Sequence, residues 1–285
     1  GVNNGHFSGR ACLQKMSSDL GVAWTAIEPF IDAFEPYLEQ TFERSVDPHV
    51  RSLSVGTYGQ GQVYGYRVAR YMEENGIPER AIERFLNRSK YFDYRNFFFK
   101  FEADNRGVRE CTTLFDCSPS IQVTHAILAD GGIDLESIGL MEAVAEILGA
   151  QEAACVGTAS TRRGFMVDQV LFSSAEIEVS WDRCRTVATL CGLSDVDWAP
   201  LANIRGQIQG TSVRVSLSFV GESVKPGVQI DLHSVPVSVL DSLLISSEDQ
   251  HMARRLGVEV PVEIDRVEIF LSPGDPVRLK TVMRG

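Results

Sequence analysis

Charged and polar residues alternate with apolar ones along several strand-like segments. Between Val213 and Phe219, apolar residues at every second position leave Arg214, Ser216 and Ser218 on the opposite face. The same alternation puts these further residues on one face: Gln229, Asp231, His233, Arg266, Glu268, Phe270, Arg278 and Lys280. If that face is enclosed, arginine, lysine and histidine facing carboxylates indicate a site for an anionic ligand. On any single strand, the same pattern is typical of an antiparallel sheet with one face exposed to solvent.

A second pair of segments carries carboxylates in the same pattern. Phe97, Phe99 and Phe101 alternate with Lys100 and Glu102. The following segment sets its apolar residues against Glu110, Thr112 and Asp116. If both faces are enclosed in one space, these carboxylates would face the arginine, lysine and histidine side chains of the first set.

The common catalytic signatures are missing from the sequence. There is no Gly-x-x-x-x-Gly-Lys loop, no Gly-x-Ser-x-Gly elbow and no Asp-Asp-x-x-Asp cluster. The five histidines show no zinc spacing. The six cysteines include no Cys-x-x-Cys pair and lie largely in apolar segments, so we interpret them as reduced core residues.

Composition restricts the class of protein. A chain of 285 residues, 44% hydrophobic and 23% charged, is long enough for one large core, and we expect a single domain over residues 1–285. The net charge of -11 disfavours nucleic acid or an anionic membrane as partner. Without a long apolar run or a secretory pattern at the N-terminus, we expect a cytoplasmic protein with no membrane span.

The chain repeats one unit, a helix followed by two strands and a short turn between them. Helical patterns cover Trp24–Phe42, Leu135–Leu148, Ile177–Cys191 and Val237–Leu256. The predicted strand pairs are Arg51–Tyr58 with Gln62–Tyr71, Asn96–Ala103 with Arg109–Cys117, Glu152–Ser160 with Phe165–Phe172, Ile208–Phe219 with Val228–Val235, and Val262–Leu271 with Val277–Met283. Regular spacing of the pairs indicates a true internal repeat.

Ten antiparallel strands leave two edges unless the sheet closes on itself. We therefore predict an α+β fold, a ten-stranded antiparallel β-barrel of five αββ(α) units with the helices outside. A barrel of that width is not filled by its own side chains. Its inner face would line a cavity, and charges there are costly unless they are paired or used.

This architecture resembles the ABBA-fold or PT-barrel prenyltransferases, both the aromatic or indole type and the cyanobactin peptide type. Nearly the whole chain takes part, but the similar stretches are short. They are Gln62–Arg70, Gly107–Phe115, Ala126–Gly132, Thr158–Phe172 and Pro273–Gly285. Two positions differ: Glu110 and Asp231 stand where the family usually has a cation.

The resemblance implies an enzyme of secondary metabolism. It would move an allylic isoprenoid group from dimethylallyl or geranyl diphosphate to an electron-rich phenol, indole or peptide acceptor inside the barrel. Arg67 and Arg278 fall where the family contacts the diphosphate. Together with the residues on the predicted inner face, the diphosphate-binding candidates are Arg67, Arg214, His233, Arg278 and Lys280.

If the resemblance holds, a base must remove a proton from the acceptor, and the candidates are Glu110 and Glu268. A structural ion pair explains Glu268 equally well and Glu110 somewhat less well.

Aromatic residues would complete such a site. Tyr58, Tyr66, Phe98 and Phe270 could offer ring faces to an allyl cation or stack on the acceptor, although core packing explains them equally well. A magnesium ion could share the diphosphate charge, held through water by Glu110 or Asp116, and no organic cofactor is expected. The sequence leaves open whether the metal is required.

Two other interpretations remain. The chain could be a non-catalytic barrel that binds a small apolar or anionic ligand, which predicts binding without release of diphosphate. It could also be a five-fold enzyme of the guanidine-modifying type. Those enzymes need a cysteine nucleophile beside a histidine, and no cysteine here lies on a glycine-rich loop next to one.

Overall fold

Five antiparallel hairpins form the centre of the molecule. The computed structural model describes residues 7–174, 177–208, 212–243 and 263–284. The strands are β1 (Glu43–Asp47), β2 (Ser52–Gly59), β3 (Phe97–Asp104), β4 (Gly107–Phe115), β5 (Cys155–Thr161), β6 (Met166–Ser174), β7 (Val213–Val220), β9 (Val228–Pro236), β10 (Glu263–Leu271) and β11 (Arg278–Arg284). The short strand β8 (Ser223–Val224) extends the β7–β9 turn.

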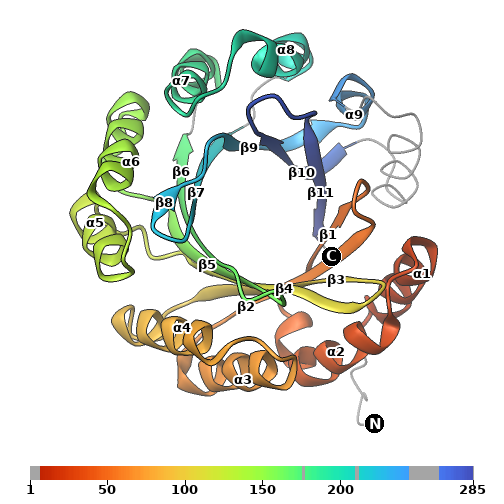
Figure 1. Ribbon diagram of the computed structural model, residues 1–285. Coiled ribbons are helices and arrows are strands. Elements are labelled where there is room, and N and C mark those ends of the chain that lie inside the picture. Colours follow the sequence, from red (N-terminus) through yellow and green to blue (C-terminus); the bar gives the residue numbers. More distant parts are fainter. Residues whose placement is uncertain (1–6, 175–176, 209–211, 244–262, 285) are drawn as a thin grey trace.

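The strands close into a barrel. Each hairpin pairs with the next along the chain, β1 pairs with β11, and β6 pairs with β7, all antiparallel. Ten strands therefore form a closed ring, as predicted (Figure 1). Closure leaves none of these ten strands with an unpaired edge. The short β8 is not part of the ring and pairs with β7.

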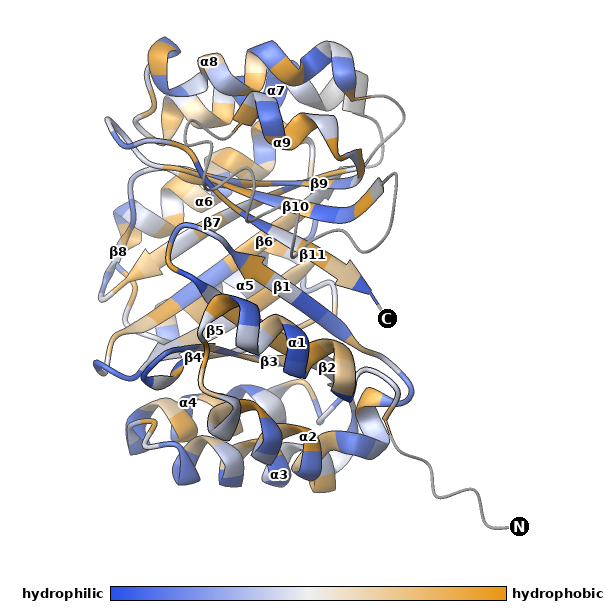
Figure 2. Cartoon of the chain, turned by 90° about the vertical axis from the view of Figure 1, so that its right-hand side faces the viewer, coloured by the Kyte–Doolittle hydropathy of each residue, from blue (hydrophilic) through white to orange (hydrophobic). Residues whose placement is uncertain are grey.

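Helices surround the ring. They are α1 (Arg10–Leu20), α2 (Trp24–Leu38), α3 (Gly61–Glu74), α4 (Glu79–Tyr91), α5 (Ile121–Asp130), α6 (Leu135–Leu148), α7 (Ile177–Leu190), α8 (Asp195–Ile204) and α9 (Ser238–Leu243), with a 3-10 turn at Arg205–Gln207. Seen from the side, they flank the strands on both sides (Figure 2). No helix among the described residues is long and apolar enough to cross a membrane.

Apolar side chains on the outer face of the barrel hold the helices against it. Phe97, Phe99 and Phe101 on β3 are fully buried, and Phe101 lies 4.6 Å from the ring of Phe30 on α2. A second apolar cluster joins α6–α9 to the outer residues of β6, β7, β9, β10 and β11. Burying a side chain of this size contributes about 2 kcal/mol, so the alternation of apolar residues fixes which strand face is outside.

The first predicted hairpin was wrong. Gln62–Tyr71, predicted as a strand, lies in α3, where Tyr64, Val68 and Met72 are buried at intervals of four residues. That spacing forms one face of a helix. The hairpin is instead β1 with β2, and the preceding helix ends at Leu38 rather than Phe42.

The other four hairpins were predicted to within a few residues at most ends, with β7 starting five residues later than expected at Val213. Helices α1, α4, α5 and α8 were not predicted, and each of the first four units carries two helices rather than one. Of the helix predicted over Val237–Leu256, α9 covers Ser238–Leu243, and residues 244–262 lie outside the described part of the chain.

Candidate functional site

The barrel encloses a charged cavity of about 250 Å³. Its walls carry seven basic and five acidic side chains among the described residues. These are Lys100, Arg109, Arg214, Lys225, Arg266, Arg278 and Lys280, against Glu43, Glu102, Glu110, Asp231 and Glu268. Inside a chain of net charge -11, the cavity is therefore positive. Such a field favours an anionic ligand.

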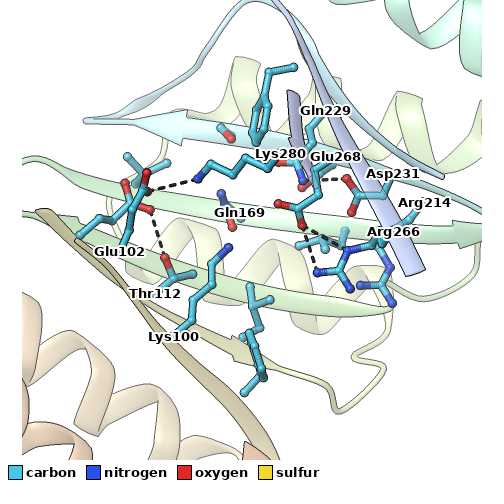
Figure 3. Close-up of a pocket in the computed structure, with 18 of the residues that line it drawn as sticks. Lys100, Glu102, Thr112, Gln169, Arg214, Gln229, Asp231, Arg266, Glu268 and Lys280 are labelled. Carbon is cyan, nitrogen blue, oxygen red and sulfur yellow. Dashed lines mark hydrogen bonds and ion pairs between the residues drawn. The ribbon is translucent and has the colours of Figure 1, made fainter. Parts of the chain in front are cut away.

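Two rows of inward side chains cross four neighbouring strands. Strand register aligns one row as Arg214, Asp231, Glu268 and Lys280, and the next as Ser216, Gln229, Phe270 and Arg278. Cations thus end the first row and carboxylates occupy its middle. The alternation in β7, β9 and β10 predicted these orientations correctly, and the close-up shows the first row converging on the cavity (Figure 3).

Glu102 is the centre of one ion-pair network. Its carboxylate lies 3.1 Å from Lys280 Nζ and 3.5 Å from an Arg109 nitrogen, and it accepts a hydrogen bond from the Ser52 hydroxyl. Burial alone would raise the pKa of Glu102, but Lys280, Ser52 and Arg109 together lower it to about 2. Glu102 is therefore a permanent anion that partly neutralises Lys280.

Arg266 is the centre of a second network. Its guanidinium lies 2.6 Å from Glu43 and 3.2 Å from Glu268. Burial opposes ionisation of Glu268, yet Lys100, Arg266 and Lys280 lower its pKa to about 2. Glu268 is thus also ionised, and it is a weak base because three cations stabilise its charged form.

Three cations on the wall form no ion pair with another described residue. They are Lys100, Arg214 and the exposed Lys225. The buried Nε of Arg214 and the hydroxyl of Ser216 also have no hydrogen-bond partner within the described part of the chain. Gly56 makes room for Lys100, since a Cβ there would lie 2.8 Å from the Lys100 Cβ and 2.3 Å from the Phe98 ring. These charges and donors face the cavity.

Asp231 differs from the other lumen carboxylates. It is 1% exposed and accepts a hydrogen bond of 2.8 Å from Gln229 Nε2. Burial and the neighbouring Glu268 raise its pKa to about 7, against the opposing effect of Arg266, Gln229 and Arg214. Asp231 therefore changes protonation near neutral pH.

The cavity continues toward the β10–β11 turn. Arg278 is 43% exposed there and donates to Asp47 at 2.9 Å. A smaller cavity of about 160 Å³ shares Lys225, Phe270 and Arg278 with the main one. A ligand could enter from this end of the barrel, where two basic side chains lie at the mouth.

Three aromatic side chains line the cavity as predicted. The Tyr58 and Phe98 rings lie 5.0 Å apart, and the Phe270 ring lies 5.6 Å from Lys280 Nζ. Tyr58 donates a hydrogen bond of 2.9 Å to Asp116, and burial with this carboxylate raises the pKa of the phenol. Ring faces and cations therefore meet in one space.

Three predicted site residues lie elsewhere. Arg67 and Tyr66 belong to α3 outside the barrel, where Arg67 donates to the Ala33 carbonyl at 2.6 Å and Tyr66 is 57% exposed. Both predictions were wrong because α3 had been taken for a strand. His233 lies near the end of β9, 3.4 Å from the Ser212 carbonyl and outside the cavity lining. Burial, Arg214 and Arg266 lower its pKa, so it is neutral at pH 7.

The remaining candidates, Arg214, Arg278, Lys280, Glu110, Glu268, Tyr58, Phe98 and Phe270, all line the cavity. The site predictions omitted Lys100, Glu102 and Arg266, although the same alternation already placed them inward. Glu43 was missed together with strand β1, and Arg109 and Lys225 lie close to hairpin turns, where alternation gives little guidance.

A metal site is not preformed. Among the described residues, no three histidine, cysteine, aspartate or glutamate side chains come together to hold an ion. Glu110 accepts from Thr112 at 3.1 Å, and Asp116 accepts from Tyr58. Magnesium often binds through one or two carboxylates plus substrate phosphates, a role that Glu110 could share.

Comparison with known proteins supports the fold. No family model and no curated protein matches the sequence. Several solved structures are similar to this chain. The structure of 5-dimethylallyltryptophan synthase from Streptomyces coelicolor has a TM-score of 0.63 and 12% identity over 97% of this chain and 96% of its own. The prenyltransferase PriB, in complex with L-tryptophan and dimethylallyl thiolodiphosphate, has a TM-score of 0.65 at 10% identity over 95% and 93%.

The NotF prenyltransferase is similar over 99% of this chain and 96% of its own, with a TM-score of 0.63 and 10% identity. The predicted PT-barrel fold is therefore confirmed. At identities this low, the likeness extends to the fold and not to the reaction.

Proposed function

We propose that this protein is a prenyltransferase that moves an allylic group from a prenyl diphosphate to an electron-rich acceptor inside the barrel. The observation that carries the proposal is a positively charged lumen, lined by aromatic rings, within a PT-barrel. The structural neighbours named above are prenyltransferases, and one was solved with L-tryptophan and a dimethylallyl thiolodiphosphate. We take an aromatic acceptor, indole or phenol, as the first to test, followed by a peptide side chain.

The diphosphate is expected to bind among Lys100, Arg214, Arg278 and Lys280. Lys100 and Arg214 form no ion pair with another described residue, and Ser216, two residues from Arg214 on β7, adds a hydroxyl without a partner among the described residues. Fixed positive charge lowers the barrier to ionisation because the departing diphosphate gains negative charge in the transition state. Magnesium could share this charge through phosphate oxygens and Glu110.

The allyl cation would form beside aromatic rings. Tyr58, Phe98 and Phe270 line the cavity and offer π faces that stabilise a cation. The closed barrel also limits the access of water, which would otherwise capture the cation. After attack, the acceptor must lose a proton to a lumen carboxylate. Glu110 and Glu268 were predicted for that role, but Glu268 lies 3.2 Å from Arg266 and is a weak base.

Calorimetric titration with dimethylallyl and geranyl diphosphate, with and without magnesium, tests the donor site. We expect micromolar binding. Arg278→Ala should weaken it by about tenfold or more, since a hydrogen bond to a charged group contributes about 1.5–3 kcal/mol. Arg67→Ala is the matched control, because that arginine lies outside the barrel and should leave the affinity unchanged. Equal affinities of both variants and the wild type would refute the site.

A non-catalytic barrel is the second candidate. Lys280 and Arg266 already have carboxylate partners in Glu102 and Glu43, which reduces the charge available to a diphosphate. Such a protein would bind a small anionic or apolar ligand without releasing diphosphate. Donor binding with no product from any phenol, indole or peptide acceptor would favour it.

A further inference from the structure

Two carboxylates lie side by side on the cavity wall. Asp231 on β9 and Glu268 on β10 are direct register partners, both buried and both lining the cavity. Like charges placed directly opposite in a sheet repel, so the two do not ionise with equal ease. Their surroundings determine which one keeps a proton.

Glu268 is held as the ion. Arg266 donates to it from two nitrogens at 3.2 Å, and Lys100 and Lys280 add further positive charge. Asp231 forms no ion pair with a described basic residue and accepts a neutral hydrogen bond from Gln229. Figure 3 shows Asp231 beside Glu268, Arg214 and Arg266.

The groups around Asp231 come from four strands. They are Gln229 and His233 on β9, Glu268 and Arg266 on β10, Arg214 on β7 and Cys155 on β5. Burial, Arg214 and Arg266 lower the pKa of His233, and burial raises the pKa of the Cys155 thiol to about 12. The ionised Glu268 and the two arginines set the proton affinity of Asp231.

We propose that Asp231 is the base that accepts the proton released by the acceptor, while Glu268 is a fixed anion that sustains its basicity. This inference rests on the proposed prenyl transfer and assigns the role of base to Asp231 in place of Glu110 and Glu268. The position of Asp231 supports this role. Its carboxylate lines the cavity, forms no ion pair with another described residue and lies next to Arg214, a cation suited to a diphosphate. A pKa raised to about 7 agrees, because the most efficient base titrates near the working pH.

In this step the allyl group passes from the diphosphate to the acceptor, and a proton passes from the acceptor to Asp231. The bond between C1 of the allyl group and the diphosphate oxygen breaks, and its electron pair leaves with the diphosphate. A π or lone pair of the acceptor forms the new bond to C1. The acceptor then loses a proton to the Asp231 carboxylate, and the electrons of the broken bond restore its aromaticity or neutral charge. Asp231 later returns its proton to water.

The test compares Asp231→Asn with the wild type. We expect kcat/KM to fall by about a hundredfold or more, as for loss of a general base, while dimethylallyl diphosphate binds within about threefold of wild type in calorimetry. The wild-type rate should decline about tenfold per pH unit below about pH 7, where Asp231 is protonated. The rate of the Asn variant should not show this decline at acidic pH. Asp231→Glu should restore both the acidic decline and part of the rate.

Asp130→Asn on the exposed face of α5 is the matched control and should behave as wild type. If the rate of Asp231→Asn still declines below about pH 7 and stays within threefold of wild type, the role of Asp231 is overturned while prenyl transfer remains intact. Absence of transfer by the wild type itself, with the donor bound, would overturn the proposed function and this role together. If the Asn variant fails to fold, Asp231→Glu decides through its pH profile.

Discussion

The free energy of unfolding of Asp231→Asn, compared with that of the wild type, should increase as pH rises. In the folded chain, burial and Glu268 raise the pKa of this carboxyl to about 7, whereas an unfolded chain has a value of about 3.9. Between those values the folded state binds a proton that the unfolded state has lost. The stability of the wild type therefore falls as pH rises from about 4 to about 7. Asparagine has no proton to lose, so the variant escapes this penalty.

The size of the effect follows from the two pKa values. Each unit of difference corresponds to about 1.4 kcal/mol, and the penalty for ionised Asp231 grows by about 2.5 kcal/mol between pH 5 and pH 8. Other groups titrate in both proteins, so most of their contribution cancels in the difference. Because Asp231 is only 1% exposed, solvent screens this effect little.

Urea unfolding at pH 5, 6, 7 and 8 measures the difference directly. The free energy of unfolding of Asp231→Asn minus that of the wild type should rise steadily across the series, by about 2.5 kcal/mol in total. Asp130→Asn should give a flat line. A constant difference for the Asp231 variant, or one that falls with pH, would show that burial and Glu268 do not hold a proton on this residue.

Three further substitutions probe the barrel. Glu102→Gln should lower the free energy of unfolding by about 3 kcal/mol at pH 7, measured in urea, because Lys280 then lacks its buried partner. The same variant should bind diphosphate more tightly in calorimetry, and weaker binding would contradict this expectation. Because the pKa of Glu102 in the folded wild type is lowered to about 2, the stability difference between wild type and variant should vanish as pH falls from about 4.5 to 2. Gly56→Ala should cost about 1–3 kcal/mol, as its Cβ would lie 2.3 Å from Phe98; unchanged stability would be the contrary result. Asp168→Asn should cost about 3 kcal/mol, since Arg84 and Arg88 both pair with this carboxylate; a loss under 1 kcal/mol would argue against a buried network.

The inner face of the barrel was predictable because strand alternation is local. Val213, Val215 and Leu217 determine that Arg214 and Ser216 face inward, and no distant residue is needed for that conclusion. Closure followed from the number of strands. The orientation of most cavity residues could therefore be read from neighbours along the chain.

Other parts of the fold depend on contacts that the sequence does not reveal. The stretch in α3 is rich in aromatic and β-branched residues, which favour strands, whereas in the structure it is a helix that packs against α2 and α4. Strand β1 reads Glu-Arg-Ser-Val-Asp and has no apolar alternation, so its position depends on pairing with β11.

The charge balance of the site is equally non-local. Glu102 and Lys280 are 178 positions apart, and Glu43 and Arg266 are 223 positions apart. The sequence indicated a buried mixture of charges, but not which cations are neutralised. That distinction leaves Lys100 and Arg214 available for a ligand and gives Asp231 its unusual proton affinity.

The most direct test of prenyl transfer is the release of diphosphate from dimethylallyl diphosphate in the presence of phenol, indole and peptide acceptors. The products are identified by mass spectrometry. We expect release that depends on one class of acceptor and yields that acceptor enlarged by one dimethylallyl group. Donor binding without acceptor-dependent release across all three classes would contradict this expectation and identify the barrel as a binding protein.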